Sequence, residues 1–331
     1  METKDRVNWG VISCARIADG AVIPGIKASS NGRLYAISGK TESKLRDFEK
    51  RHNPQKAYDS YEALLSDPNV DAVYIPLPNS MHLEWVVKAA ESGKHILCEK
   101  PLSLTVEQVK EMQAACEKNG VLLMEAFAYR HNPAIIKVKE LLDQGVIGKP
   151  ALIEGHFSFL PGDENDIRLQ KDLGGGSLYD VGSYPINLFR YLTGKQPEEI
   201  CAQAMMHPKT GVDTNACVVY SYGDGLLGMI HCSFDAVFMN GFTIAGDKGI
   251  IEYPGLYHAT GHIPIRILRQ DPVVQPMQQE EIVRVNCQDN YMLEVEQFGR
   301  CILNGEKPRL SLEETMDNLA TIKRIHELIG Y

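Results

Sequence analysis

The regular alternation of short apolar runs with helical patterns in the first part of the chain constrains its fold most. Apolar, β-rich runs lie at residues 7–13, 34–38, 71–75, 95–98 and 121–124, and helical patterns lie at 16–29, 41–51, 59–65, 81–92 and 105–118. Strands separated by helices of this length form right-handed βαβ units, and such units build a parallel sheet. The sequence therefore predicts an α/β fold that begins with a Rossmann-type doubly wound parallel sheet.

In the remainder of the chain the alternation of strands and helices ends, and strand-like runs dominate. These runs lie at residues 152–159, 200–206, 216–222, 226–234, 242–245, 250–253 and 265–268, with helices expected at 133–144, at 177–191, after Asp289 and after Ser311. Gly223-Asp224-Gly225 stands between two of the runs as a hairpin signal. We expect residues 1–127 to form a dinucleotide-binding domain. Residues 128–331 are expected to form an α+β domain with a mostly antiparallel sheet, which binds substrate and dimerises, and whose final helices can pack back on the first domain.

Composition narrows the choice of partners. The chain has 331 residues and a formal net charge of −9, which disfavours binding to nucleic acid or to an anionic membrane. No apolar run approaches the roughly 18 residues of a membrane span. The eight cysteines form no C-x-x-C pair, and the ten histidines show no H-E-x-x-H spacing. We therefore expect reduced, buried thiols in a cytoplasmic protein and no metal site.

The stretch "WGVISCARIADG" stands where a dinucleotide-binding chain has its phosphate loop. The G-x-G-x-x-G spacing reads here as Ser13-Cys14-Ala15-Arg16-Ile17-Ala18, without any glycine. Serine and alanine still allow a close approach to pyrophosphate, provided that the turn does not need a positive φ. The following helix start offers N–H groups to a phosphate, and Arg16 adds a cation. A plain strand–helix turn, as found in any α/β protein, is the alternative interpretation.

The end of the second predicted strand bears on the choice of dinucleotide. An NAD-binding domain tends to place an acid there for the ribose hydroxyls. This chain has Ser38-Gly39-Lys40-Thr41, and a cation beside hydroxyls suits the 2′-phosphate of NADP. Glu42 could bind the ribose of NAD if the helix start turned it inward. A solvated lysine at a helix start remains the alternative.

Three further stretches carry candidate chemistry. They are "YIPLPNSMHLE", "HILCEKPLSLT" and "LGGGSLYDVGSYPINLFRYLTG". Taken singly, each has an ordinary explanation: Lys-Pro after a strand is typical of a surface turn, and a tyrosine such as Tyr184 on a helix is typical of a core or a cap. Asp180 and Tyr184, four residues apart, are expected to share a helix face.

Together and in this order, these stretches resemble the Gfo/Idh/MocA oxidoreductase family. The resemblance extends over essentially the whole chain, and its motifs are "WGVIS", Glu99-Lys100-Pro101, "EAFAYRHNP", "LLDQGVIGKP" and the glycine-rich run before Asp180. "EAFAYR" and Tyr184 look like the dihydrodiol dehydrogenase and xylose dehydrogenase branch. Many relatives have histidine at the position of Tyr184. The chain departs from the family's pattern at Ser13 and Ala15.

The resemblance implies an NAD(P)-dependent dehydrogenase or reductase that prefers NADP and acts on a sugar, cyclic polyol or diol. In the family's arrangement Lys100 polarises the reacting hydroxyl or carbonyl, Tyr184 transfers the proton, and Asp180 orients substrate hydroxyls. A lysine beside a phenol lowers the phenol's pKa, which suits acid–base work. The predicted cofactor residues, taken from the loop and from the resemblance, are Ser13, Ala15, Arg16, Ile17, Lys40, Pro76, Asn79, His82, Glu99 and Lys100. For His82 alone, a cap at a helix start is the alternative.

Two further expectations concern function class and assembly. A catalytically idle, cofactor-sensing regulator could use the same fold, but such a protein needs neither Lys100 nor Tyr184, so their presence favours an enzyme. The run Ala216-Cys217-Val218-Val219-Tyr220 is apolar on both alternations, so both faces of its sheet are expected to be buried. We expect a homodimer formed sheet to sheet, as in the relatives, or a pair of such dimers.

Overall fold

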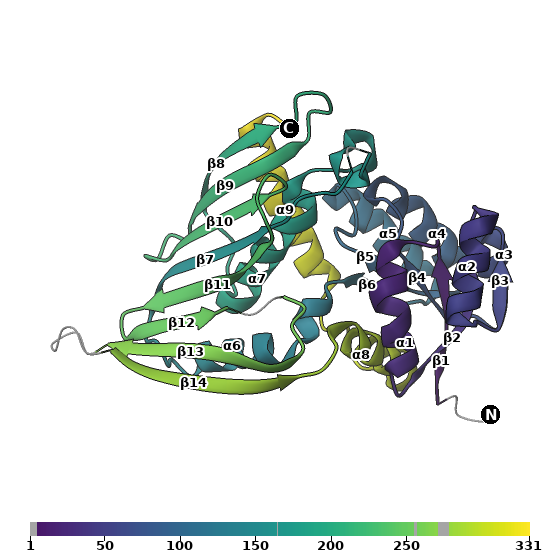
Figure 1. Ribbon diagram of the computed structural model, residues 1–331, viewed down its shortest axis with the longest axis horizontal. Helices are drawn as coiled ribbons and strands as arrows, with labels where there is room; N and C mark the ends of the chain where they lie inside the picture. Colours follow the sequence, from purple (N-terminus) through teal and green to yellow (C-terminus); the bar gives the residue numbers. More distant parts are fainter. Residues whose placement is uncertain (1–4, 164, 255–256, 271–277) are drawn as a thin grey trace. The chain divides into compact units, whose positions relative to one another are not determined.

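The computed structural model describes residues 5–163, 165–254, 257–270 and 278–331 (Figure 1). The chain divides into two compact units. One comprises Met1–His131 with Asp289–Met316, and the other comprises Asn132–Gln288 with Asp317–Tyr331. Within the described residues, no helix combines the length and the apolar character that crossing a membrane requires.

The first unit is built on a six-stranded parallel sheet with the order β3-β2-β1-β4-β5-β6. Its strands are β1 (Val7–Ile12), β2 (Gly32–Ser38), β3 (Lys56–Tyr58), β4 (Ala72–Ile75), β5 (His95–Glu99) and β6 (Leu123–Ala126). Its helices are α1 (Ile23–Ala28), α2 (Glu42–His52), α3 (Tyr61–Leu65), α4 (His82–Glu91), α5 (Val106–Asn119) and α8 (Asn290–Asn304). The order of the strands reverses between β1 and β4, and open α/β sheets bind ligands at the carboxyl ends of the strands beside such a point. The predicted Rossmann-type sheet is confirmed, with β3 as an additional short edge strand.

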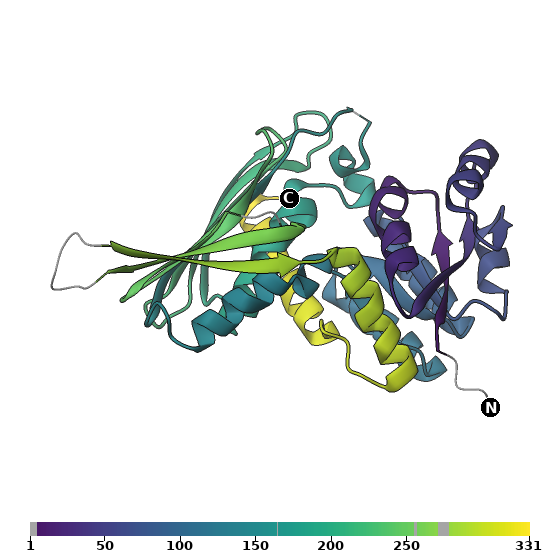
Figure 2. The same cartoon turned by 60° about the horizontal axis from the view of Figure 1, so that its bottom comes forward.

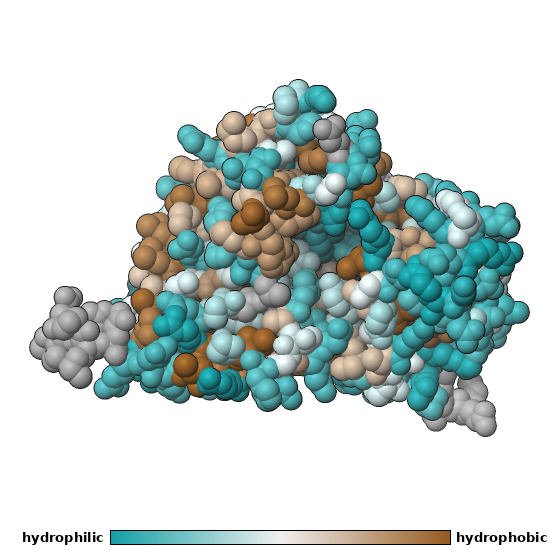
Figure 3. All heavy atoms as spheres, viewed as in Figure 1, coloured by the Kyte–Doolittle hydropathy of each residue, from teal (hydrophilic) through white to brown (hydrophobic). Residues whose placement is uncertain are grey.

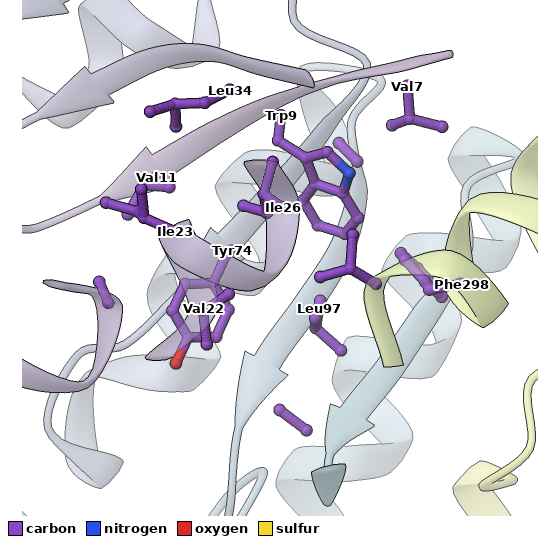
Figure 4. Packing of buried hydrophobic residues seen from close by; sticks show 14 of the residues in the cluster. Val7, Trp9, Val11, Val22, Ile23, Ile26, Leu34, Tyr74, Leu97 and Phe298 are labelled. Atoms are coloured by element: carbon purple, nitrogen blue, oxygen red, sulfur yellow. The ribbon is translucent and has the colours of Figure 1, made fainter. Parts of the chain in front are cut away.

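The hydrophobic core of this unit joins the early strands to a helix from far along the chain (Figure 4). Trp9 on β1 is fully buried, and its ring centre lies 6.0 Å from that of Phe298 on α8. Ile26 on α1 and Val295 on α8 belong to the same cluster. A segment nearly 300 residues downstream of β1 therefore completes the core of the first sheet.

The second unit contains an eight-stranded sheet with the order β14-β13-β12-β11-β7-β10-β9-β8. All neighbours are antiparallel except β7 and β10, so the predicted mostly antiparallel sheet is confirmed. The strands are β7 (Pro150–Ser158), β8 (Glu199–Met206), β9 (Asp213–Ser221), β10 (Leu227–Ser233), β11 (Met239–Gly246), β12 (Gly249–Tyr253), β13 (Gly261–Gln270) and β14 (Gln278–Cys287). The helices are α6 (Pro133–Asp143) and α7 (Ser183–Thr193), and α9 (Leu312–Ile329) runs from the first unit into the second.

Two predicted helices are each divided. The segment 16–29 forms a π-helical turn at Ala18–Val22 followed by α1, and the segment 177–191 forms a π-helical turn at Leu178–Gly182 followed by α7. Pro24 stands in the first turn of α1, where its missing N–H costs little. Asp180 therefore lies in a π-helical turn, whereas Tyr184 lies in the α-helix that follows it.

Helices α6 and α7 lie on one face of the large sheet (Figure 2). We call the opposite side the open face. One row of side chains across it comprises Ile282, Arg266, Glu252, Thr243, Glu154, Met229, Val219 and Cys201, each paired with the next in register. Hydrophobic side chains gather over these strands in Figure 3. Five apolar residues of the open face, Leu152, Met205, Val219, Leu227 and Met229, are 46–65% exposed.

The cysteines are only partly as expected. All eight are free thiols, and five of them are buried. Cys201 and Cys217 are exposed on the open face, because β8 and β9 direct alternate residues away from the helices. The expectation of buried thiols is therefore wrong for these two.

Candidate active site

The predicted phosphate loop leaves β1 through a residue with unusual backbone geometry. Ser13 has a φ of 88°, and its N–H donates to the carbonyl oxygen of Ser38 on β2 at 3.0 Å. The turn thus needs the left-handed conformation that glycine supplies freely, so the condition attached to the serine replacement is not met. A non-glycine residue in such a conformation costs roughly 1–3 kcal/mol. Serine occupies the glycine position under strain.

The loop packs tightly against the residue that follows β2. A Cβ atom on Gly39 would lie 2.7 Å from the Sγ of Cys14, so the space that a side chain would need is already filled. The acid that NAD-binding domains place near this point has no room at position 39. Glu42, at the start of α2, is exposed.

Lys40 is held beside this loop by aromatic rings. Its Nζ lies 4.9 Å from the ring centre of Tyr61 and 5.7 Å from that of Trp85. Burial raises the pKa of Tyr61, and a hydrogen bond with the Ser13 side chain partly offsets this effect. Ser13 and Lys40, both predicted to bind the cofactor, thus meet around one tyrosine. In the same loop Arg16 is exposed, and Ala15 and Ile17 are partly exposed.

His82, a predicted cofactor residue, is fully buried. Its Nε2 lies 2.8 Å from the carbonyl oxygen of Leu77, and its Nδ1 lies 3.1 Å from the carbonyl oxygens of both Pro101 and Leu102. Burial lowers the pKa of the imidazole, and the three carbonyl oxygens partly offset that effect. His82 therefore ties the loop after β4 to the loop after β5. Pro76 and Asn79, also predicted cofactor residues, lie in the first of these loops.

Glu99, at the end of β5, belongs to a cluster of buried acidic and phenolic groups. The Tyr74 hydroxyl donates to Oε1 of Glu99 at 2.5 Å. Glu294 on α8 is fully buried, and burial together with the charge of Glu99 raises its pKa well above the usual range. The protonated acid is the form that such an environment favours.

The loop that carries Lys100 is held by a carboxylate that the sequence reasoning missed. Glu125, on β6, accepts from the Leu102 N–H at 2.8 Å and from the Thr315 hydroxyl at 2.7 Å. Burial raises the pKa of Glu125 to about 7, and the hydrogen bonds from Thr315 and Leu102, followed by the charge of Lys100, partly oppose this rise. Glu125 is the first residue of the motif "EAFAYR", to which the sequence analysis assigned no role. An acidic residue inside an apolar strand was the feature that could have pointed to a buried, hydrogen-bonded carboxylate. The Lys100–Pro101 peptide bond is cis.

Tyr184 on α7 stands in an aromatic cluster of the second unit. It is 7% exposed, and its ring centre lies 5.2 Å from those of Phe157 and Tyr257. Its hydroxyl lies 3.1 Å from Nε2 of His258. His258 was missed because a single histidine in an irregular segment, 74 residues from Tyr184, carries no pattern.

Asp180, the predicted substrate residue, is paired with an arginine. Nε of Arg168 donates to Oδ2 of Asp180 at 2.7 Å, and Nη1 of Arg168 lies 3.2 Å from Oδ1 of Asp166. The carboxylate of Asp180 raises the pKa of Arg168 further. Asp180 is mostly buried, and this ion pair fixes the orientation of its carboxylate.

The first unit brings the predicted cofactor residues to one edge of its sheet. Ser13 follows β1, Lys40 follows β2, Pro76 follows β4 and Lys100 follows β5, each at the carboxyl end of its strand. Tyr184 and Asp180 belong to the second unit. In the described part of the chain, no group of three or more His, Cys, Asp or Glu side chains is arranged to hold a metal ion.

Comparison with known proteins finds two family models and several relatives. A family model described as an oxidoreductase family with an NAD-binding Rossmann fold matches residues 7–127, and a model of the GFO/IDH/MocA C-terminal domain matches residues 135–252. The chain is 34% identical over 322 residues to D-xylose 1-dehydrogenase (NADP(+)) 2 of Haloferax volcanii, and the match covers 96% of both proteins. It is 30% identical to trans-1,2-dihydrobenzene-1,2-diol dehydrogenase of Xenopus laevis, with 95% of each covered. The crystal structure of KijD10, a 3-ketoreductase from Actinomadura kijaniata in complex with NADP and TDP-benzene, matches with a TM-score of 0.90 and 28% identity, over 98% of each chain.

Proposed function

The chain belongs to the GFO/IDH/MocA oxidoreductase family, and from this premise we propose that it transfers a hydride between a nicotinamide dinucleotide and a hydroxyl or carbonyl carbon of a sugar, cyclic polyol or diol. The observation that carries the proposal is the parallel sheet whose strand order reverses between β1 and β4, with Ser13, Lys40 and Lys100 at its carboxyl edge. In this proposal residues 1–127 hold the dinucleotide, and residues 128–331 hold the substrate.

We propose NADP as the preferred cofactor. The space after β2 fits a cofactor whose ribose is recognised by a cation, because Gly39 leaves no room for an acid and Lys40 stands beside it. A charge-assisted contact from Lys40 to the 2′-phosphate would stabilise binding by roughly 1.5–3 kcal/mol, or about ten- to hundredfold. NADP also appears in the names of the xylose dehydrogenase and of the KijD10 complex.

Lys40→Asp tests this preference. We expect the wild-type kcat/KM to favour NADP, and we expect the variant to favour NAD, because an acid repels the 2′-phosphate and accepts hydrogen bonds from ribose hydroxyls. An unchanged ratio in the variant, or a wild-type enzyme that favours NAD, would remove Lys40 from this role.

Three side chains of the protein act in the proposed reaction, and one of them, Tyr184, transfers the proton. When bound, the dinucleotide donates or accepts the hydride. Lys100 polarises the reacting oxygen, Tyr184 donates a proton to it during reduction or accepts one during oxidation, and Asp180, directed by Arg168, orients neighbouring substrate hydroxyls. A cation and a phenol that act on one oxygen make up a common acid–base pair.

The activity test is a panel of aldoses, cyclic polyols and diols with NADP and NAD, followed by the absorbance of the reduced nicotinamide. Lys100→Ala and Tyr184→Phe should each lower kcat by roughly 10²–10³. The double variant should lose less than the product of these two factors, because the residues act as a unit. A single variant with near wild-type kcat would refute that residue's role. The regulator alternative receives no support from the relatives, which are named as dehydrogenases and reductases.

We also propose a homodimer formed through the open face, or a pair of such dimers, in the cytoplasm. The support for the dimer is the set of half-exposed apolar side chains on the open face. The support for the compartment is that all eight cysteines are free thiols.

A further inference from the structure

We propose that His258 is a positioning and proton-relay residue that exchanges a proton with the hydroxyl of Tyr184 during turnover. This inference rests on the proposed function, because it assumes that Tyr184 is the group that gives the proton to substrate. It adds a second residue of the same unit to that chemistry.

The contact between the two side chains is direct. Nε2 of His258 lies 3.1 Å from the Tyr184 hydroxyl oxygen, and the two rings are nearly perpendicular, at 86°. A phenol and an imidazole can each donate or accept, so one hydrogen bond of this length can carry a proton in either direction.

The surroundings fix the tyrosine and enclose Nδ1 of the histidine, which is buried. The Tyr184 ring packs against Phe157 and Tyr257, and its 7% exposure leaves little contact with solvent. His258 is half-buried. The titratable groups along these contacts include the hydroxyls of Tyr184, from α7, and of Tyr257, the residue before His258. A buried phenol that must be reprotonated in every cycle gains a proton donor in such a partner.

The proton balance is simple. During reduction the Tyr184 O–H bond breaks and its proton goes to the substrate oxygen, while the protonated His258 gives its Nε2 proton to the Tyr184 oxygen. His258 becomes neutral and takes up one proton before the next cycle, so that each reduction consumes one proton. The hydride, with both electrons, comes from the reduced nicotinamide. Oxidation follows the same steps in reverse.

His258→Gln separates relay from positioning. The glutamine amide can still hydrogen-bond the phenol but cannot exchange a proton, and removing an acid–base group typically costs about 10²-fold or more in kcat. We expect kcat to fall by this order with little change in KM. We also expect the transition that His258 contributes to the pH profile of kcat to be absent from this variant. In His258→Ala, added imidazole should restore part of the rate. His262→Gln changes an exposed histidine on β13 and serves as the matched control.

The outcomes separate this inference from the proposed function. If Tyr184→Phe is inactive while His258→Gln keeps the wild-type kcat and pH profile, the relay is wrong and the proposed function stands. If Tyr184→Phe is fully active, the role of Tyr184 falls and the relay falls with it. A readout without turnover is the titration of His258 by NMR: its midpoint should move in Tyr184→Phe, and an unmoved midpoint would overturn the coupling even if the other variants fold poorly.

Discussion

At the scale of single residues, the site depends on close contacts that leave no space for alternatives. Gly39 and Cys14 illustrate this, because the Sγ of Cys14 fills the volume that a side chain at position 39 would need. Glu125 illustrates it for polar groups, because one buried carboxylate accepts from both Leu102 and Thr315. Each contact can be tested by a substitution that changes only that contact.

Gly39→Ala should weaken dinucleotide binding. The new methyl group would meet Cys14 Sγ at 2.7 Å and displace the phosphate loop. Overpacking of this kind costs roughly 1–3 kcal/mol, equivalent to about a five- to hundredfold rise in Kd. Calorimetric titration measures this effect. Cys14→Ala in the same chain removes the sulfur and should restore most of the affinity; a double variant as weak as the single one would show that the sulfur is not the obstacle.

Glu125→Gln should flatten the dependence of stability on pH. The folded pKa of about 7 exceeds the ordinary 4.5, so protonation favours the folded state. This raised pKa stabilises the folded state by roughly 3 kcal/mol. The stabilisation is complete below pH 4.5 and is lost as the pH rises through 7. The glutamine keeps an acceptor for Leu102 and has no charge to bury. Thermal unfolding between pH 4.5 and 8 measures the change.

Part of the dependence of stability on pH should persist in Glu125→Gln, because the pKa of Glu294 is raised in the same direction. The exposed Glu111 on α5 offers the control, Glu111→Gln, which should leave the slope unchanged. Equal slopes for the wild type and Glu125→Gln would contradict the assignment.

At the scale of elements, the position of α7 depends on a glycine in the sheet beneath it. A Cβ on Gly155 of β7 would lie 2.9 Å from the Phe189 ring and 3.1 Å from Cβ of Pro185. Pro185 follows Tyr184 directly, so the distance between α7 and the sheet also sets the position of the tyrosine. Helix and strand therefore set the position of Tyr184 together.

Gly155→Ala should lift α7 and lower both stability and kcat. We expect a loss of roughly 1–3 kcal/mol in the free energy of unfolding, measured by urea denaturation. Adding Phe189→Leu makes room and should recover part of both quantities. Gly162→Ala, where a Cβ would meet nothing within 4 Å, is the control. A Gly155→Ala variant with wild-type stability and kcat would show that α7 can shift without affecting either quantity.

The elements also show how far the sequence could predict the structure. The strands of the first sheet and most of the second were predictable, because buried strands are continuous apolar runs. Strand β14 was not, because "QQEEIVRVN" begins with four polar residues and mixes polar with apolar residues after them. Strand β3 has only three residues. The phosphate loop could be located but not its positive φ at Ser13, which no local pattern encodes. Glu125 and His258 acquire partners only through tertiary contacts.

At the scale of the whole molecule, the open face is the feature that bears on assembly. Met229 and Val219 are register partners on β10 and β9, and both are 46% exposed. A stable dimer buries roughly 800 Å² on each partner, and half-exposed apolar side chains at its centre contribute most.

Replacing Val219 and Met229 together by lysine should convert the proposed dimer to a monomer. Two lysines on each copy would bring four charges into one interface, where they would remain unpaired. Light scattering at assay concentrations measures the mass. Leu328→Lys, at a 55% exposed leucine of α9, controls for added charge. A wild-type chain that is monomeric, or a lysine variant that remains dimeric, would refute an interface on this face.

The placement of α8 in the core of the first unit has a consequence for how the protein is made. When residue 131 leaves the ribosome, the six strands exist but Val295 and Phe298 do not, so the surface around Trp9 and Ile26 has no cover. At about 5–20 residues per second, synthesis needs roughly 10–35 s more to reach Asn304. During this interval the nascent sheet exposes an apolar face of the kind that chaperones bind. We expect a nascent chain stalled at residue 131 to be protease-sensitive, and one stalled well beyond Asn304 to be protected.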